Sequence, residues 1–482
     1  MGYPVSRLGS PSITIIASRS LPSSPTILSA KSITKPSSIS ISLSYISTSS
    51  AMSGSPSTIR VAILGGGLAG AALLRGLLRY HHIAVDIYES RPTFQEEALG
   101  LSLTDDAQDI LHALDPALDQ CLDRAGAVHS LLDIRIATGP NVGQRVLVAG
   151  LEGHVKKTLG RQALLDELLK GMPPQIMHLN ARIASITELT AGEGLLVTFA
   201  DGSQKKYDVV IGASGFNGLA RKHVLGADNP AVKLHHTGVW GLPITVPLDK
   251  AQEAMGTEFL DPGNPTQTAW IADGILMQHN LLNHGRDVQI SIYVRYYDCG
   301  EDAPWARLFS PDEFSGIFAD IHSPVCQGMV KLIQSIYTVQ IAGICQMQHQ
   351  PTPQSYVTKN ACLIGDSAYA MMVHQGAGAI IALEEALVLS TLLGRASSRE
   401  AIPAALQAFD RTCRPRAEHA AQYSAHLGLV FTGRHPSVGP DAGLIAQELQ
   451  RRWVFLAQTD VEAQRAAAVG LMDQLLAGGR CY

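Results

Sequence analysis

Apolar positions in the first half of the chain form short continuous runs separated by stretches with helical spacing. Residues 60–64 form an apolar run that passes directly into Gly65-Gly66-Gly67-Leu68-Ala69-Gly70, and the apolar positions of residues 68–80 recur with helical spacing. A second run over residues 84–89 ends in Glu89. This order of strand, glycine turn, helix and strand predicts a parallel sheet with a crossover helix.

The pattern continues along the chain with further elements of both kinds. Helices are expected over 105–122, 162–171 and 378–393, strands over 183–186, 194–199, 205–211 and 361–365, and a hairpin over 132–149. The turn dipeptide Asp201-Gly202 joins two of these strands. Residues 230–353 contain strand-like runs with short helical pieces, and residues 396–482 have mostly helical spacing. We therefore predict an α/β fold with a discontinuous Rossmann-like domain (58–229 and 354–395), an inserted sheet-containing domain (230–353) and a helical C-terminal region (396–482).

The first 57 residues differ in kind from the rest. They are dominated by Ser, Ile, Thr and Pro and carry basic residues but no acid. Such a composition predicts disorder, and it is also typical of an organellar transit segment. The alternative is an upstream extension without function, because Met52 stands just before the predicted fold. An intracellular protein is expected in both cases, mitochondrial in the first and cytoplasmic in the second.

Composition excludes several classes of protein. The 482 residues carry a net charge of −5, which gives no indication of a nucleic-acid surface. The seven cysteines show neither C-x-x-C nor zinc-ligand spacing, so we expect reduced thiols and no metal site. The longest apolar candidate for a membrane span, residues 379–393, contains Glu384 and Glu385, and no span is predicted.

The glycine turn has the spacing of a dinucleotide-binding loop. Gly65 permits the tight turn, Gly67 allows the backbone to approach a pyrophosphate, and Gly70 permits close packing of the helix on the strand. The N–H groups at the start of the helix would bind phosphate oxygens, and Glu89 would accept hydrogen bonds from ribose hydroxyls. A purely structural glycine turn is the alternative, but the strands, the helix and the terminal acid together favour a nucleotide.

Two distant segments complete a pattern with this loop. They are Asp208-Val-Val-Ile-Gly-Ala-Ser214-Gly215 and Leu363-Ile-Gly365-Asp366, the latter continuing through His374 to Gly378. From Ile59 to at least Arg416 the chain resembles the single-component FAD-dependent aromatic monooxygenases, the family of salicylate hydroxylase and para-hydroxybenzoate hydroxylase, especially its fungal secondary-metabolism branch. The resemblance implies FAD as the cofactor and makes residues 58–229 and 354–395 an FAD-binding domain, with residues 230–353 binding the substrate.

The resemblance also implies roles for individual residues. Asp366 would accept a ribityl hydroxyl, while Gly376, Gly378 and Ala379 would bring bare backbone to the flavin ring. Arg161 would reach the phosphate side of the cofactor, and Gly100 would line the FAD cleft. Arg221 would act in catalysis by binding the substrate phenolate. For each there is a structural alternative: a helix N-cap at Asp366, a surface arginine at Arg161, a loop glycine at Gly100 and a helix-face ion pair at Arg221.

The chain departs from the family pattern at several positions. Ser214 replaces an aspartate, Tyr369 a histidine, Val373 a proline and Ala377 a glutamine, and Val239-Trp240-Gly241 stands where Tyr-Arg-Gly is common. His374 is the titratable residue of the expected flavin loop. It is either a proton shuttle or a ligand contact near neutral pH, or a loop histidine hydrogen-bonded to backbone. FAD binding is still expected despite these departures. They concern the residues on which the hydroxylation reaction of the family depends.

The resemblance implies that NAD(P)H reduces FAD, that O2 then forms a flavin hydroperoxide, and that one oxygen atom passes to a phenolic or polyketide-type small molecule. NADH and NADPH are not distinguished. The alternatives are a flavin oxidase, an epoxidase or a ring-forming flavoenzyme on a polyketide or terpenoid, a non-catalytic flavoprotein, and an NAD-linked dehydrogenase. The last leaves the segment from Asp366 to Gly378 unexplained.

Overall fold

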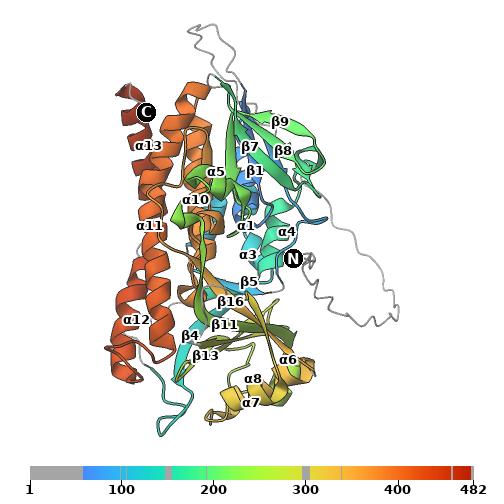
Figure 1. Cartoon of the computed structure of the whole chain (residues 1–482). Coiled ribbons are helices and arrows are strands. Elements are labelled where there is room, and N and C mark those ends of the chain that lie inside the picture. The colour runs from blue at the N-terminus through green and yellow to red at the C-terminus, as the bar shows by residue number, and fades with distance from the viewer. Residues whose placement is uncertain are drawn as a thin grey trace, which may run out of the picture. The chain divides into compact units, whose positions relative to one another are not determined.

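The computed structural model describes residues 58–97, 99–104, 106–146, 155–190, 193–295, 304–337, 339–457 and 460–478. These residues belong to one unit, Gly54–Tyr482, and the predicted extension 1–57 lies outside them. Their strands form three sheets of five, nine and three strands (Figure 1). No helix in the described part of the chain is long and apolar enough to cross a membrane.

The five-stranded sheet is parallel, with the strand order β17-β10-β1-β2-β6. Its strands are β1 (Ile59–Leu64), β2 (Ile83–Tyr88), β6 (Met177–His178), β10 (Val209–Gly212) and β17 (Ala361–Leu363). The apolar runs of β1, β10 and β17 are buried on both faces, as parallel strands between helices require. The predicted Rossmann-like core is therefore present.

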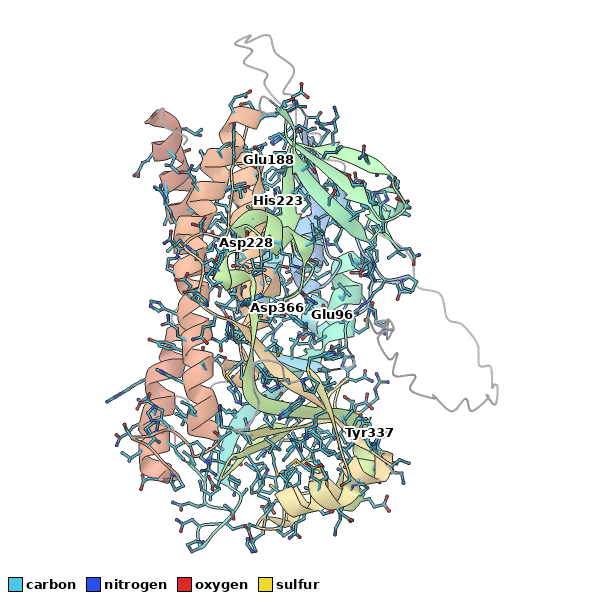
Figure 2. The ribbon with its side chains drawn as sticks, viewed as in Figure 1. Glu96, Glu188, His223, Asp228, Tyr337 and Asp366 are labelled. Atoms are coloured by element: carbon cyan, nitrogen blue, oxygen red, sulfur yellow. The ribbon has the colours of Figure 1, made fainter. Side chains whose placement is uncertain are left out.

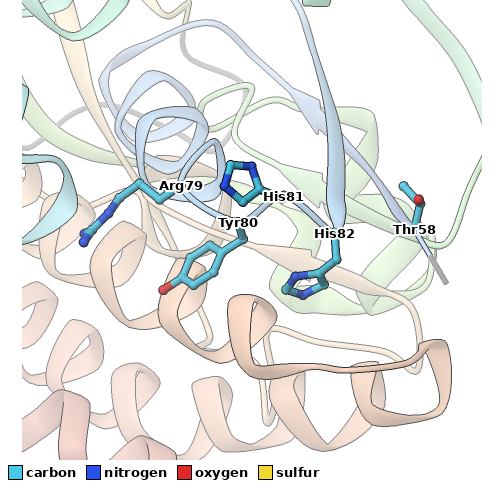
Figure 3. A pocket seen from close by; sticks show the side chains of 5 residues that line it. All are labelled: Thr58, Arg79, Tyr80, His81 and His82. Carbon is cyan, nitrogen blue, oxygen red and sulfur yellow. The ribbon is translucent and has the colours of Figure 1, made fainter. Parts of the chain in front are cut away.

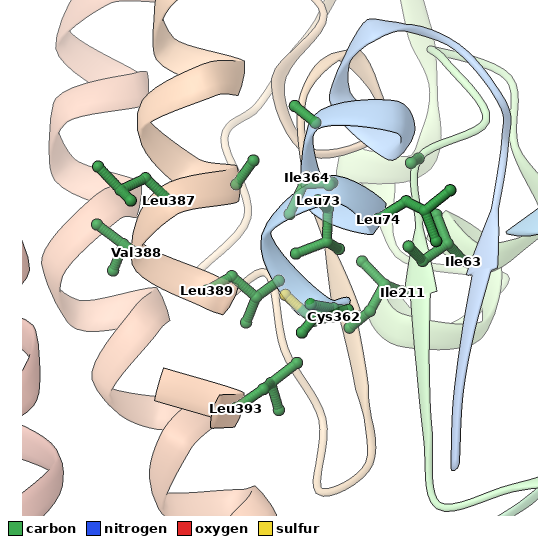
Figure 4. Packing of buried hydrophobic residues seen from close by; sticks show 14 of the residues in the cluster. Ile63, Leu73, Leu74, Ile211, Cys362, Ile364, Leu387, Val388, Leu389 and Leu393 are labelled. Carbon is green, nitrogen blue, oxygen red and sulfur yellow. The ribbon is translucent and has the colours of Figure 1, made fainter. Parts of the chain in front are cut away.

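Helices pack against this sheet and complete its core. They are α1 (Leu68–Leu77), α2 (Ala107–Leu114), α3 (Cys121–Arg124), α4 (Arg161–Leu169), α5 (Leu219–Leu225), α9 (Asp366–Tyr369) and α10 (Gly378–Arg395). Leu73 and Leu74 of α1 meet Ile63, Ile211 and the apolar face of α10 (Figure 4). Close contact of α1 with α10 places the N-termini of both helices on the same side of the sheet as the carboxyl ends of β1 and β17.

The nine-stranded sheet has the order β15-β16-β11-β14-β13-β12-β4-β5-β3. Its strands are β3 (Gly100–Leu103), β4 (Val128–Ile136), β5 (Val155–Gly160), β11 (Leu234–Pro247), β12 (Thr266–Ala272), β13 (Ile275–Leu282), β14 (Asp287–Arg295), β15 (Ala306–Phe309) and β16 (Ile341–His349). One face carries an apolar core under α6 (Leu248–Met255), α7 (Pro311–Ile317) and α8 (Pro324–Ile336). Part of the other face is covered by α11 (Ile402–Phe431) and α12 (Ala442–Ala457).

A small antiparallel sheet and the C-terminal helices complete the described chain. The sheet contains β7 (Ile183–Glu188), β8 (Leu195–Phe199) and β9 (Gln204–Tyr207). Helix α13 (Val461–Ala477) packs on α10 and α11, and Figure 1 shows these three helices running together. The cysteines of the described chain, Cys121, Cys326, Cys345, Cys362 and Cys413, are buried free thiols.

Three predicted elements are wrong in detail. The helix expected over 105–122 breaks into α2, a 3-10 turn at Pro116–Leu118 and α3, because Pro116 has no N–H to continue a helix. The strand expected over 205–211 is divided between β9 and β10, which belong to different sheets. The division falls at Asp208, whose carboxylate accepts from the Arg60 backbone N–H at 2.8 Å and pairs with the Arg60 guanidinium.

The third difference concerns the hairpin expected over 132–149. The first strand is present as β4, but it pairs with β5 and, in parallel, with β12. The expected turn is present, because Arg135 and Arg145 form an antiparallel bridge and backbone hydrogen bonds join Ile134 to Val146 and Ile136 to Gly143 and Gln144. The rest of the predicted second arm, residues 147–149, lies outside the described chain. Strands β3, β4 and β5 thus extend the large sheet beyond residues 230–353, so the predicted boundary at 230 does not separate one sheet from the other.

Candidate functional site

The turn from β1 into α1 requires glycine for steric reasons. Gly65 has φ +124°, and a Cβ there would lie 2.3 Å from the Ala213 carbonyl oxygen. A Cβ at Gly70 would lie 2.0 Å from the carbonyl oxygen of Gly65. Gly67 is the N-cap of α1 and provides no side-chain cap. The first N–H groups of α1 therefore point toward whatever anion lies at this end of the helix.

Glu89 follows β2 and lies beside the glycine turn. Its Oε2 accepts the Gly66 N–H at 3.1 Å, and its Oε1 accepts the Arg91 N–H at 2.9 Å. A carboxylate held in this way keeps lone pairs for further hydrogen bonds. The contact of Glu89 with a ribose stays a prediction.

A second carboxylate, from Glu96, lies at the start of α1. Its Oε1 accepts the Leu68 N–H at 3.1 Å, and its Oε2 lies 3.1 Å from Nε and 2.9 Å from Nη2 of Arg161. Glu96 was not predicted as a site residue, because it belongs to a polar segment without periodicity. The arrangement puts an anion and its cation at the end of the helix where a phosphate is expected.

Asp366 faces this same ion pair from the first turn of α9. Burial raises the pKa of its carboxyl, the nearby Arg161 lowers it, and Glu96 and Glu97 raise it again. Figure 2 shows Asp366 and Glu96 close together. A Cβ at Gly365, which has φ +56°, would lie 3.0 Å from the Cβ of Ala69, so the turn before Asp366 packs directly on α1.

The segment before α10 is also shaped for close approach. Gly376 has φ +67°, and Gly378 is the first residue of α10. A Cβ at either glycine would meet no described atom within 4 Å. Ala379 is half-buried and packs against the main core. Bare backbone thus borders open space here, as the prediction for Gly376 and Gly378 requires.

Arg221 has surroundings that differ from the prediction. The residue is 1% exposed. Its Nε and Nη2 donate to the Ala231 carbonyl oxygen at 3.1 and 2.6 Å, and its Nη1 donates to the carbonyl oxygens of Ser367 and Ala368 at 2.8 and 2.6 Å. A guanidinium engaged in this way holds backbone and does not face a ligand. In the described residues Arg221 clamps α9 in place, and its expected role in catalysis stays a prediction.

His349 makes a second clamp on the same segment. Its Nδ1 accepts the Ala370 N–H at 3.0 Å, so its Nε2–H donates to the Phe216 carbonyl oxygen, also at 3.0 Å. Burial lowers the pKa of His349 to about 3, which keeps the ring neutral. No sequence pattern predicts this histidine, because its partners lie 21 and 133 residues away along the chain.

A group of polar side chains lies on one face of the nine-stranded sheet, beside Gly100. It consists of Gln278, Asn280, Gln289 and Ser291, which form cross-strand pairs on one face of β13 and β14 and are named here the amide strip. A Cβ at Gly100 would lie 2.2 Å from Oε1 of Gln289. Gly100 also pairs with Gly160, the residue before Arg161. The amide strip therefore lies next to the glycine predicted to line the cofactor site.

Comparison with known proteins gives a consistent result, although no protein-family model matches the chain. A 6-methylsalicylate 1-monooxygenase of Aspergillus terreus is 30% identical over 432 residues, covering 87% of this chain and 93% of that protein. A salicylate hydroxylase of Pseudomonas putida is 28% identical over 422 residues, covering 85% and 94%. The solved structure of a salicylate hydroxylase substrate complex matches with a TM-score of 0.71 and 25% identity, covering 86% and 98%.

The chain belongs to the FAD-dependent monooxygenases. Membership in this family confirms the predicted α/β fold, the oxidoreductase class and FAD as the cofactor, with NAD(P)H the co-substrate typical of the family. It does not favour the alternatives of an oxidase, an epoxidase, a dehydrogenase or a non-catalytic flavoprotein.

The departures from the family pattern have identifiable surroundings in this monooxygenase. Tyr369 is buried, and its hydroxyl donates to Oε2 of Glu385 at 2.9 Å, which also accepts the Gly365 N–H at 2.9 Å. Burial raises the pKa of Glu385 to about 8. Tyr369 and Glu385 thus form a pair that supports the turn before Asp366. Val373 is 41% exposed and Ser214 is also exposed.

His374 of the monooxygenase is buried, and an expected contact with a ligand stays a prediction. Both ring nitrogens are buried and have no hydrogen-bond partner among the described residues. The ring centre lies 5.6 Å from that of Tyr293 on β14. Burial lowers the pKa of His374 to about 3, which favours the neutral ring.

A pocket of about 420 Å³ lies elsewhere on the monooxygenase. It is lined by Thr58 and by Arg79, Tyr80, His81 and His82, which connect α1 to β2 (Figure 3). These residues lie at the amino ends of β1 and β2. Ligands of open parallel sheets bind at the carboxyl ends of the strands, so we do not assign this pocket to the cofactor.

Proposed function

We propose that this chain transfers one oxygen atom of O2 to the electron-rich ring of a phenolic or polyketide-type small molecule in secondary metabolism, with NAD(P)H as reductant. The main support is the convergence of three sequence-distant segments at the start of α1, beside the bare backbone of Gly376 and Gly378. The curated relatives support the substrate class, since they are named for salicylate and 6-methylsalicylate.

The residues present fit the chemistry of FAD. Glycines 65, 67 and 70 and the first turn of α1 would receive the diphosphate, with Arg161 as its cation and Glu89 as the ribose acceptor. Asp366 would accept from the ribityl chain, and Gly100, Gly376, Gly378 and Ala379 would border the flavin. When bound, FAD accepts electrons from NAD(P)H and activates O2. The clamps made by Arg221 and His349 fix the position of the Asp366 turn relative to these groups.

The amide strip is the proposed contact for the polar groups of the substrate. Gln289 donates to Oγ of Ser291 at 3.2 Å, and Gln278 lies directly across from Ser291. Amides and hydroxyls can both donate and accept hydrogen bonds, so they suit hydroxyl and carbonyl groups on an aromatic ring. Tyr293, Leu276 and Ile271 on the same face belong to an apolar cluster that includes residues of α11 and α12.

The activity is tested on purified protein by its colour and by flavin reduction. The holoenzyme is expected to be yellow and to be reduced anaerobically by NADPH or NADH, faster in the presence of one member of a panel of salicylic and resorcylic acids. Under air, that compound should be recovered one oxygen atom heavier. Reduction of the flavin by the organic compound alone would instead indicate an oxidase, and a colourless protein that takes up no FAD would refute the proposal.

The role of the amide strip is tested by Gln278→Leu. This change removes one hydrogen-bonding side chain, so we expect a higher KM for the substrate and unchanged FAD content. Gln334→Leu on α8 is the matched control, because α8 covers the opposite face of the sheet. Equal KM values for the two variants would exclude Gln278 from the substrate contact.

A further inference from the structure

Glu96 occupies a position that the proposed cofactor also needs. Its side chain is 13% exposed. The carboxylate accepts the N–H of Leu68, the first residue of α1, and lies against Nε and Nη2 of Arg161. A Cβ placed on Gly67 would lie 2.9 Å from Oε1 of Glu96. The carboxylate therefore lies directly against the glycine where a diphosphate is expected to approach.

The rest of its segment holds Glu96 in this place. The Glu96 N–H donates to Oε1 of Gln162 on α4 at 2.8 Å. The ring of Phe94 lies over the turn, where a Cβ on Gly66 would come within 2.3 Å of it. Residues 94–96 thus cover the backbone of Gly66 and Gly67 and close the end of α1.

The charges around Glu96 would favour replacement of its carboxylate by a diphosphate. Glu96 forms an ion pair with Arg161, and Glu97 and Asp366 also act on this guanidinium electrostatically. A diphosphate at the start of α1 would add further negative charge within the same few ångströms, and like charges at this range repel. Movement of the Glu96 carboxylate away from α1 relieves the repulsion and frees both the N–H groups and Arg161.

We propose that Glu96 is a built-in competitor for the cofactor diphosphate. In the FAD-free protein it holds the start of α1 and Arg161, and FAD binding displaces it while Arg161 exchanges the carboxylate for a phosphate. The inference rests on the proposed cofactor site. It gives Glu96 a role in setting FAD affinity and no role in the oxygen-transfer step.

The experiment measures the Kd of FAD for the apoprotein by quenching of flavin fluorescence, with inorganic pyrophosphate as a competing probe. We expect Glu96→Gln to bind FAD about tenfold more tightly than the wild type, because a charge-assisted hydrogen bond no longer has to be broken. Pyrophosphate should compete at correspondingly lower concentration. Glu96→Ala should also bind more tightly than the wild type, and thermal unfolding of each apoprotein checks that it is folded.

Glu97→Gln is the matched control, since it removes the same charge one residue away from an exposed side chain. We expect it to change the Kd by less than threefold. Equal or weaker FAD binding by both Glu96 variants would overturn the inference and make Glu96 a support for Arg161. Tighter binding without hydroxylation of any compound would instead refute the proposed function alone, and absence of FAD binding in all proteins would refute both.

Discussion

Replacement of Arg221 by alanine distinguishes a structural from a catalytic role. In the structure its guanidinium donates four hydrogen bonds to the carbonyl oxygens of Ala231, Ser367 and Ala368. Burial lowers the pKa of Arg221 only to about 10, so the side chain is charged at neutral pH and its hydrogen bonds are charge-assisted. The variant leaves three buried carbonyl groups without these donors.

The magnitude follows from those three groups. A buried polar group without a partner costs about 1–3 kcal/mol, and relief from burying a charge offsets part of the sum. We therefore expect Arg221→Ala to lower the free energy of unfolding by roughly 3 kcal/mol. A chain of this size unfolds with an entropy of about 1.0 kcal/mol/K, so Tm should fall by about 3 °C. FAD content should fall as well, because Ser367 and Ala368 follow Asp366 directly in α9.

The assay combines thermal unfolding, flavin absorbance per protein and kcat. Lys222→Ala is the matched control, because Lys222 is the exposed neighbour of Arg221 on α5. Arg221→Lys should give an intermediate Tm, since an ammonium keeps the charge but cannot reach all three carbonyl oxygens. An Arg221→Ala protein with wild-type Tm and full FAD content but greatly reduced kcat would refute this reasoning and restore the contact with the substrate.

Three further changes have definite expected outcomes. Asp366→Ala should lower FAD occupancy, measured as flavin absorbance per protein, and an unchanged occupancy would remove Asp366 from the cofactor site. Gly70→Ala should lower both Tm and FAD content, since its Cβ would lie 2.0 Å from the Gly65 carbonyl oxygen; Gly470→Ala on α13, where a Cβ meets no described atom within 4 Å, should leave both intact. For Glu385 the folded pKa is raised to about 8 from an ordinary value of 4.5, so wild-type stability should fall as pH rises from about 5 to 8. Glu385→Gln should flatten this dependence in thermal unfolding, and an unchanged slope would contradict the assignment.

The local pattern was sufficient to locate the strand, turn and helix at Gly65–Gly70. The strand is a continuous apolar run and the helix has regular spacing, so both signals lie within a few residues of each other. Local patterns also predict Glu89, which follows the second strand, and α10, whose apolar positions recur with helical spacing. The division of residues 205–211 at Asp208 could not be found in this way, because it depends on Arg60, a partner in a distant part of the chain.

Glu96 and Arg221 show why the site itself could be predicted only in part. Arg161 was recognised, but its partner Glu96 belongs to a polar segment whose fold is decided by Gln162 and α1. The motif position of Arg221 suggested a ligand, whereas its side chain meets carbonyl groups 146 and 147 residues away. A useful signal would have been an arginine within an otherwise apolar helical face, which indicates a buried partner.

The sequence by itself determined which residues could form a nucleotide-binding turn and which elements would surround it, because backbone sterics and apolar periodicity act over short distances. Only the tertiary structure decided which charged side chains face one another at that turn and which form hydrogen bonds with backbone groups instead. The physical reason is that hydrogen bonds and ion pairs depend on distances of about 3 Å between groups that the chain brings together only after its sheets and helices have packed.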